Sequence, residues 1–288
     1  MPNSDPPKNL YKYFPPNRIS TLDNAMLRYT PLGDFNDPFE GRPAIVDLMH
    51  PEETLDVFLN ELPEELSKIY EKLPEENKIN VNRDEFIAPK IKLAKSKKIE
   101  LLQSLNESLP STRENFYKDL DNTVGILCLT EIPDNILMWS HYSDSHSGFA
   151  IEFNTHHQYF QETDPNTYLL KRLQRVIYKD TRPNARFGEL EPKEFFLTKS
   201  LHWNYEREWR ILREMKDADS IDQKEPFSIN LFKFPKEAVS SIILGARASR
   251  KTEESIREIL RSHPEYKFAT LKRAIPSESQ FMLHIIAI

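Results

Sequence analysis

The spacing of the apolar positions changes along the chain. Near the start, an aromatic-rich run at residues 10–14 and a second run at residues 27–30 have the composition of β-strands. From residue 51 to residue 119, apolar residues recur every three or four positions among many charged ones, which predicts amphipathic helices. After residue 123 the composition and alternation of strands return. The sequence therefore predicts an α+β fold with a mixed, largely antiparallel sheet core.

The second half of the chain holds most of the predicted strands. They are expected at residues 124–129, 149–153, 175–178, 205–213, 227–232, 239–244, 267–271 and 281–286. Helices are expected at residues 136–142, with Asp134 as the cap, and at 252–262. In the first half, Asn17 is expected to cap a short helix, because its amide can accept a hydrogen bond from a free helix N–H.

The charged helical stretch interrupts the strand pattern. We expect residues 1–50 and 120–288 to form one α+β domain, and residues 51–119 to form a helical insert or cap. Pro63 and Pro74 are expected to divide the insert into separate helices, because proline removes a backbone hydrogen bond and clashes with the preceding turn.

Composition indicates a globular, cytoplasmic protein. Hydrophobic residues make up 39% and charged residues 29% of the 288. No run of roughly 18 apolar residues predicts a membrane-spanning helix, and the first residues lack the basic flank and apolar core of a signal peptide. The single cysteine, Cys128, excludes an internal disulfide and a cysteine-based zinc cluster. Its apolar neighbours predict a buried thiol.

Charge and glycine content narrow the functional classes. The net charge of −6 argues against tight, constitutive binding to nucleic acid, although a basic stretch at residues 171–186 is compatible with a transient nucleic-acid substrate. There are only 6 glycines, with no phosphate-binding loop, no Gly-x-Gly-x-x-Gly and no Gly-x-Ser-x-Gly. Nucleotide hydrolysis by a phosphate-binding loop, Rossmann redox chemistry and serine hydrolysis therefore lose support.

Two glutamates and an arginine alternate in the predicted strand at residues 205–213. On a strand, Glu206, Glu208 and Arg210 would share one face. Two carboxylates about 7 Å apart along a strand need polar partners if they are buried. The segment is therefore either an exposed strand face with cross-strand ion pairs, or a paired-carboxylate site that stabilises a cationic transition state.

Two further groups of residues are candidates for a site. Trp139, His141 and Tyr142 lie close together, either at the edge of the core or on the wall of a pocket that stacks a flat ring. His141 and His146 are five residues apart and so do not share a helical face, and we expect no metal site.

The third candidate group lies near the start of the chain. Asn36 and Asp37 precede a proline and favour a turn, and Lys12 and Tyr13 belong to the first predicted strand. These four residues are either structural or part of a site formed with the later segments.

Taken together, these stretches resemble a bacterial family, the domain of unknown function 2971 family. The resemblance is carried, in order, by residues 10–13, 35–40, 138–142, 148–153 and 203–210. The family name implies no activity.

The order of elements is also similar to that of ADP-ribosyltransferases, including defence and toxin–antitoxin members. That resemblance identifies Glu206-Arg207-Glu208 as the late Glu-x-Glu motif. The early position would be taken by Lys12, Tyr13 or Arg28, and no early histidine is present. A clear Ser-Thr-Ser motif is absent, which leaves Thr130 or Tyr142 for the middle position.

The resemblance implies NAD as a substrate. Glu208 and Glu206 would be catalytic. The residues implied in NAD binding are Lys12, Tyr13, Asn36, Asp37, Trp139, His141, Tyr142 and Arg210. The ADP-ribose acceptor would be nucleic acid or protein, and an antitoxin protein is an expected partner.

Three hypotheses of function follow. The leading one is an NAD-dependent ADP-ribosyltransferase acting as a defence effector or toxin. The second is a metal-dependent nuclease using Asp37, Glu40 and Glu208, which would act without NAD and stop on chelation. The third is a non-enzymatic binding module whose contact surface is the helical insert.

Overall fold

The computed structural model describes residues 5–45, 51–79, 81–161, 169–186, 189, 191–224 and 226–288. Its contacts divide the chain into two compact units. Unit 1 contains Met1–Arg42, Lys118–Arg182 and Pro192–Ile288, and unit 2 contains Pro43–Tyr117 and Pro183–Glu191. The predicted domain limit at residue 50 lies outside the described residues. None of the helices described is both long enough and apolar enough to cross a membrane.

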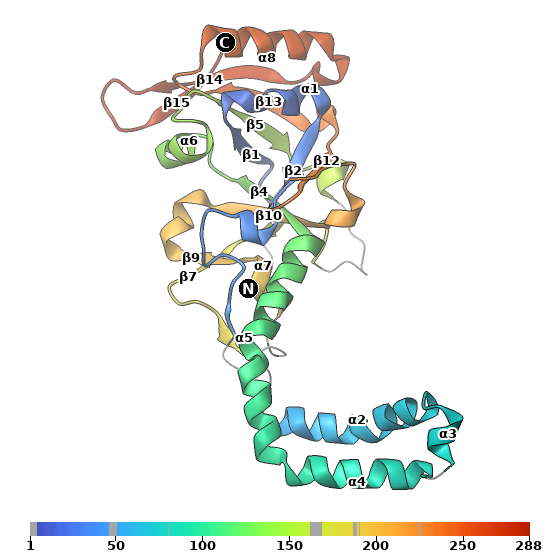
Figure 1. Cartoon of the computed structure of the whole chain (residues 1–288). Helices are drawn as coiled ribbons and strands as arrows, with labels where there is room; N and C mark the ends of the chain where they lie inside the picture. Colours follow the sequence, from blue (N-terminus) through green and yellow to red (C-terminus); the bar gives the residue numbers. More distant parts are fainter. Residues whose placement is uncertain are drawn as a thin grey trace. The chain divides into compact units, whose positions relative to one another are not determined.

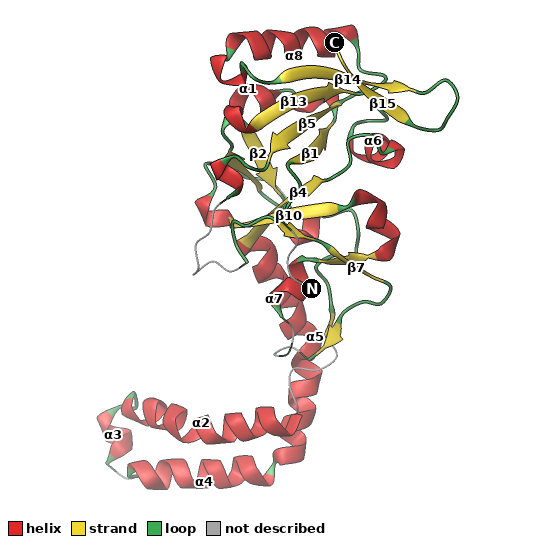
Figure 2. Ribbon diagram, turned by 180° about the vertical axis from the view of Figure 1, so that it is seen from behind, coloured by secondary structure: helices red, strands yellow, loops and turns green. Residues whose placement is uncertain are grey.

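Unit 1 is built on an eight-stranded sheet with the order β15-β14-β13-β5-β1-β4-β10-β6 (Figures 1 and 2). Its strands are β1 (Asn9–Phe14), β4 (Val124–Thr130), β5 (Phe149–Asn154), β6 (Gln174–Arg175), β10 (Glu208–Glu214), β13 (Val239–Leu244), β14 (Thr270–Pro276) and β15 (Leu283–Ala287). All neighbours pair antiparallel except β13 and β14. The predicted α+β class with a largely antiparallel sheet is therefore confirmed.

Smaller elements complete unit 1. A three-stranded sheet has the order β11-β12-β2, from β2 (Met26–Tyr29), β11 (Ser220–Asp222) and β12 (Ile229–Lys233). A parallel pair joins β7 (Ile177–Lys179) to β9 (Thr198–Ser200). The helices are α1 (Ser20–Asn24), α6 (Ile136–Tyr142), α7 (Pro192–Phe196) and α8 (Arg250–Ser262).

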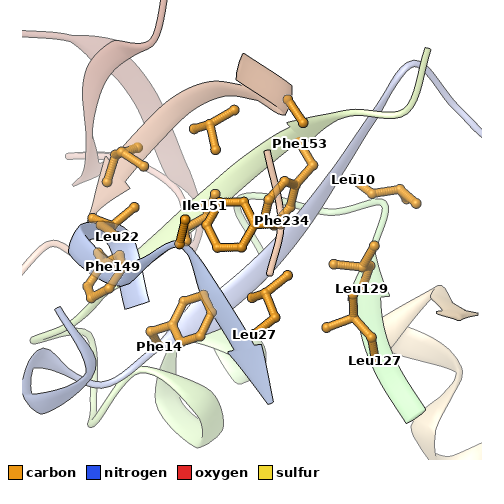
Figure 3. Close-up of a cluster of buried hydrophobic side chains, with 14 of the residues drawn as sticks. Leu10, Phe14, Leu22, Leu27, Leu127, Leu129, Phe149, Ile151, Phe153 and Phe234 are labelled. Carbon is orange, nitrogen blue, oxygen red and sulfur yellow. The ribbon is translucent and has the colours of Figure 1, made fainter. Parts of the chain in front are cut away.

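Side-chain alternation along β1 supplies both faces of the large sheet. Leu10 and Phe14 join the main apolar cluster, which also contains Ile256 of α8 and Phe232 of β12 (Figure 3 shows part of it). Tyr13 points to the opposite face and packs with α6. Burial of apolar surface on both faces fixes the register of this strand and therefore the direction of every side chain on it.

The two N-terminal strands both meet one edge of β4 but leave part of it uncovered. β1 pairs with β4 through Tyr11 and Thr130, whereas β2 continues into a bridge between Thr30 and Ile126. In a strand, the backbone groups of alternate residues point to the same edge. Cys128 therefore presents its carbonyl group to a gap between the two pairings.

Unit 2 contains α2 (Pro51–Glu71), α3 (Glu75–Lys78), α4 (Arg83–Ser96) and most of α5 (Lys98–Thr123), with the short parallel pair β3 (Ala44–Ile45) and β8 (Asn184–Ala185). The expected break at Pro63 is wrong, because this proline lies inside α2. Strong helix formers on both sides offset the loss of one backbone hydrogen bond. Pro74 does separate two helices, since it is the residue immediately before α3.

Two predicted helix caps are corrected by the structure. Asn135, not Asp134, begins α6: its side-chain oxygen accepts hydrogen bonds from the N–H groups of Leu137 and Met138, at 2.8 and 3.2 Å. Asn17 lies within a 3-10 helix before α1 rather than at a cap. In both cases neighbouring residues or turns could also form the start of the helix. The local backbone geometry determines which of them does.

Gly148 lies where the turn after α6 passes the end of β1. A Cβ atom added here would lie 1.9 Å from the Phe14 carbonyl oxygen, which is backbone and has little freedom to move. We expect Gly148→Ala to lower the free energy of unfolding by about 1–3 kcal/mol, as overpacking does elsewhere. Urea denaturation of the variant tests this, with Gly33→Ala as a comparison whose nearest contacts are side-chain atoms rather than backbone. An unchanged stability for Gly148→Ala would contradict the close packing.

Candidate active site

A cavity of about 400 Å³ opens in unit 1 beside the uncovered edge of β4. Its size is that of a small-molecule site. Its wall includes seven of the residues that the sequence singled out: Lys12, Tyr13, Asn36, His141, Tyr142, Glu206 and Glu208. These residues come from the first strand, the loop before β3, α6, the 3-10 helix before β10 and the start of β10, so the fold brings together all three groups of candidates.

The backbone places Glu206 and Glu208 differently from the prediction. Glu206 ends a 3-10 helix, Arg207 has a left-handed φ of 42°, and β10 begins only at Glu208. The strand predicted at residues 205–213 therefore begins three residues before the observed start of β10. Both carboxylates nevertheless reach the cavity wall, because the turn at Arg207 takes the place of regular strand geometry.

Within β10 the predicted alternation is correct. Glu208 and Arg210 lie opposite Thr130 and Cys128 of β4, on one face of the sheet. Trp209 and Ile211 belong to the apolar cluster on the other face. The ion-pairing face is buried, however, not exposed: Glu206 and Glu208 are each 3% exposed and Arg210 is fully buried.

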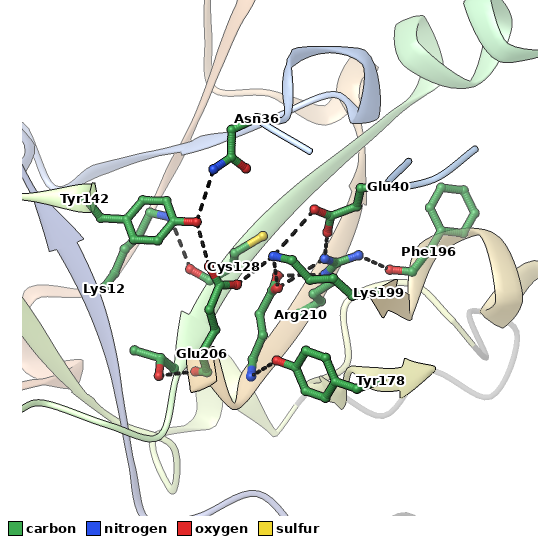
Figure 4. A network of polar contacts seen from close by, with 12 residues as sticks. Lys12, Asn36, Glu40, Cys128, Tyr142, Tyr178, Phe196, Lys199, Glu206 and Arg210 are labelled. Atoms are coloured by element: carbon green, nitrogen blue, oxygen red, sulfur yellow. Dashed lines mark hydrogen bonds and ion pairs between the residues drawn. The ribbon is translucent and has the colours of Figure 1, made fainter. Parts of the chain in front are cut away.

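Lys199 of β9 bridges the two glutamates (Figure 4). Its ammonium lies 2.6 Å from a Glu206 carboxylate oxygen and 2.8 Å from a Glu208 carboxylate oxygen. It also lies 3.4 Å from Glu40. Burial opposes the charged form of Lys199, but the carboxylates of Glu208 and Glu206 raise its pKa above the usual value, so it is a fixed cation.

Arg210 holds the far side of this group. Its Nε lies 2.7 Å from Glu208, its second terminal nitrogen also contacts Glu40, and its Nη1 donates to the Phe196 carbonyl at 2.5 Å. Burial lowers the pKa of Arg210 to about 9, and the charge of Asp37 opposes this shift, so the guanidinium stays charged at neutral pH. Arg210 is therefore not on the cavity wall, and its role is to fix Glu208 and Glu40.

Two tyrosines hydrogen-bond to the same glutamates. Tyr142 donates to a Glu206 oxygen at 2.6 Å, and the Asn36 amide lies 3.5 Å from the Tyr142 hydroxyl. The Tyr178 hydroxyl accepts a hydrogen bond from the Glu208 N–H at 2.9 Å. Burial and the neighbouring Glu206 raise the pKa of Tyr142, so its hydroxyl remains a proton donor.

The ion network carries an uneven charge. Glu40, Glu206 and Glu208 supply three negative charges, and Lys199 and Arg210 supply two positive ones, which leaves one formal negative charge. Burial and the nearby Glu208 raise the pKa of Glu206, although the Lys199 ammonium opposes this shift. The group therefore favours a positive charge arriving from the cavity.

Besides Arg210, two of the residues implied in NAD binding are placed away from the cavity wall. Trp139 is fully buried; its indole N–H donates to the Pro133 carbonyl and its ring packs edge-on against Tyr13 at 4.9 Å. It therefore supports Tyr13 and offers no free face for stacking. Asp37 is buried and accepts the Phe39 N–H at 2.9 Å, which is the structural turn role considered in the sequence. His141 is exposed at the wall.

Cys128 also lies on the cavity wall, and it is partly exposed rather than fully buried as expected. Burial and the proximity of Glu208 raise its pKa well above the usual thiol value. The thiol is therefore protonated at neutral pH and is a weak nucleophile.

The sequence did not single out Lys199 or Tyr178. Lys199 stands in a three-residue strand with little apolar pattern, and only the pairing of β9 with β7 places it beside the glutamates. The sequence indicated only that two buried carboxylates need cationic partners. It did not indicate which lysine or arginine would be that partner. Among the described residues, no group of three or more His, Cys, Asp or Glu side chains is arranged to hold a metal ion.

The family model for a protein of unknown function, DUF2971, matches residues 138–211. This confirms the resemblance to that family over a segment that contains Tyr142, Lys199, Glu206, Glu208 and Arg210. The stretches at residues 10–13 and 35–40 lie outside the match. No curated protein and no solved structure matches the chain.

Proposed function

We propose that the cavity is an active site that transfers ADP-ribose from NAD to an acceptor. The observation that carries the proposal is the surplus of negative charge in the network of Glu40, Glu206, Glu208, Lys199 and Arg210, all three of whose glutamates line a ligand-sized cavity. The resemblance to ADP-ribosyltransferases, based on the Glu-x-Glu at residues 206–208, points to the same chemistry.

The proposed reaction breaks the bond between nicotinamide and ribose. The bonding electron pair leaves with the nicotinamide nitrogen, which becomes neutral, and positive charge builds up on the ribose. A fixed carboxylate close to the ribose lowers the energy of that state. Glu208, held by Lys199 and Arg210, is the residue that we assign to this role.

Glu206 is assigned to the acceptor. An acceptor oxygen or nitrogen forms the new bond to the ribose and loses a proton, for which a carboxylate of raised pKa is a suitable base. Tyr142 orients Glu206 through its hydrogen bond. Whether the acceptor is protein or nucleic acid, and whether the protein serves as a toxin or defence effector with an antitoxin partner, stay predictions from the sequence.

The nuclease hypothesis has less support from the geometry. Of its three carboxylates, Glu40 and Glu208 are in ion pairs with Lys199 and Arg210, and Asp37 closes a turn. A metal ion would have to compete with two fixed cations for these oxygens.

Labelled NAD tests the proposed activity. The purified protein is incubated with a cell lysate and NAD labelled in its ADP-ribose part; the label is measured in protein and in nucleic acid, and released nicotinamide is measured separately. Label transferred to one acceptor class is the expected result and identifies that class. No NAD binding and no turnover by folded protein would contradict the proposal, and activity on nucleic acid that stops with chelator would favour the nuclease.

Removing the Tyr142 hydroxyl is expected to slow the reaction. Tyr142→Phe deletes a charge-assisted hydrogen bond to Glu206, and we expect a fall in turnover of about tenfold. Tyr70→Phe is the matched control, since it removes a tyrosine hydrogen bond in unit 2, to the Val81 carbonyl at 3.0 Å. Equal activities of the two variants would show that Tyr142 does not orient Glu206.

A further inference from the structure

Lys12 is a cation of the cavity wall with no carboxylate partner. Among the residues that the structure describes, its ammonium forms one hydrogen bond, to the Cys128 carbonyl at 3.1 Å, and no ion pair. This carbonyl lies in the gap between the β1 and β2 pairings on the edge of β4. Lys12 therefore occupies the place where a neighbouring strand would otherwise cover the edge.

Arg28 of β2 is a second cation on the same wall. One terminal nitrogen pairs with Asp34 at 2.5 Å, where both side chains are partly exposed. Its Nε is buried and has no hydrogen-bond partner in the described part of the chain. A guanidinium normally presents several donors together to a planar anion, so an unused buried donor at a cavity wall is available to a ligand.

Keeping these cations partly buried is unfavourable without an anion. Burial lowers the pKa of Lys12, and the positive charge of Arg28 acts in the same direction. The charge of Glu208 opposes this shift without reversing it, and Glu206 and Glu208 both contact Lys199 rather than Lys12. The wall therefore has one part formed by Lys12 and Arg28, where Asp34 is paired with Arg28, and a second part formed by the glutamates around Lys199.

We propose, building on the function proposed above, that Lys12 and Arg28 form an anion-binding subsite that takes a phosphate group of the ligand. A ligand bound there and at the glutamates would be a nucleotide with its phosphates at the cations and a sugar toward Glu206 and Glu208. A neutral nucleoside lacks the group that this part of the wall binds. The substrate class is therefore a phosphorylated sugar derivative rather than a free nucleoside or sugar.

Calorimetric titration with pyrophosphate, ADP and adenosine tests the subsite without any turnover. Pyrophosphate and ADP should bind, adenosine should bind at least about tenfold more weakly than ADP, and added salt should weaken ADP binding. Equal affinities for ADP and adenosine would overturn the proposal. Binding of ADP but not of pyrophosphate would do so as well, since the base rather than the phosphate would then be recognised.

Two substitutions test whether Lys12 and Arg28 form the subsite. Lys12→Met and Arg28→Met should each weaken ADP binding about tenfold or more, because each removes a charge-assisted contact. Arg250→Met on α8 is the matched control, since its side chain is 92% exposed and far in sequence from the cavity wall residues. ADP affinities of Lys12→Met and Arg28→Met equal to that of the control would overturn the assignment.

The unfolding temperature shows whether weaker ADP binding by Lys12→Met comes from loss of the subsite or from misfolding. Without ligand, Lys12→Met should unfold at a temperature no lower than wild type, since it removes an unpaired charge and keeps an apolar stem. A lower unfolding temperature would show that Lys12 stabilises the fold and would count against a ligand role. Binding of ADP and pyrophosphate that depends on both cations, without NAD turnover, would keep the subsite and reject the transferase.

Discussion

Glu208→Gln is expected to lower the transfer of ADP-ribose from NAD by about 100-fold or more. The change replaces a fixed negative charge by a neutral amide of the same shape, which removes the stabilisation of positive charge on the ribose. The Glu208 carboxylate is held in place by Lys199 at 2.8 Å and by Arg210 at 2.7 Å. A neighbouring carboxylate would therefore have to move far to take over its role. Initial rates of nicotinamide release from saturating NAD measure the effect.

Some loss of stability will accompany this variant, because the amide leaves two buried cations with less counter-charge. Glu152→Gln is the matched control. Glu152 is also a buried glutamate of the same sheet, 4% exposed and paired with Lys272 at 2.7 Å, but it is not on the cavity wall. Both variants should lose stability, and only Glu208→Gln should lose activity. Retained turnover in folded Glu208→Gln would reject Glu208 as the charge-stabilising residue.

Lys199→Met is expected to cost about 3–5 kcal/mol of unfolding free energy at pH 7.5. It removes the cation in contact with Glu206 and leaves the buried carboxylates of Glu40 and Glu208 with Arg210 as their partner. The cost should shrink at pH 5, where a proton can be bound between the carboxylates. Urea denaturation at the two pH values measures the difference.

The direction in which stability changes with pH follows from the direction of the pKa changes of Lys199 and Glu206. Lys199 has a raised pKa in the folded protein, so its contribution is fully present below the unfolded value of 10.5 and does not change between pH 5 and 7.5. Glu206 has a raised pKa, so the folded state holds a proton that the unfolded state has released, and stability falls as pH rises from about 4.5. Without Lys199 this raised pKa should move higher still, and the fall should become steeper.

Lys199→Arg separates charge from packing in this experiment. It keeps the positive charge but changes the reach and shape of the head group. We expect its loss of stability to depend less on pH than that of Lys199→Met. An equal loss at pH 5 and 7.5 for Lys199→Met would contradict the view that repulsion among the carboxylates causes it.

Local pattern was enough to predict much of the sheet. Strand β13 has the predicted limits, Val239–Leu244, and α6 has the predicted limits, Ile136–Tyr142. Both are short runs whose apolar spacing is clear and whose ends are marked by turn residues. The last two strands begin later than expected, because turns after α8 and at residues 277–282 take up residues of high strand propensity.

The site was predictable as a set of acidic and aromatic residues but not as a geometry. Alternation on β10 correctly grouped Glu208 with Arg210. It failed at Glu206, because the left-handed Arg207 is a backbone choice that side-chain periodicity does not reveal. Lys199 and Arg28 are brought to the cavity by pairing between strands far apart in sequence, which no local window can detect.

The position of β1 in the middle of the sheet has a consequence for how the chain folds during synthesis. Asn9 and its contact Glu152 are 143 residues apart, and β4, on the other side of β1, begins only at Val124. At roughly 5–20 residues per second, the ribosome needs roughly 7–30 s to deliver those partners. Through that time an aromatic strand with two unpaired edges has left the exit tunnel, and a chaperone that binds nascent chains would be expected to recognise this segment.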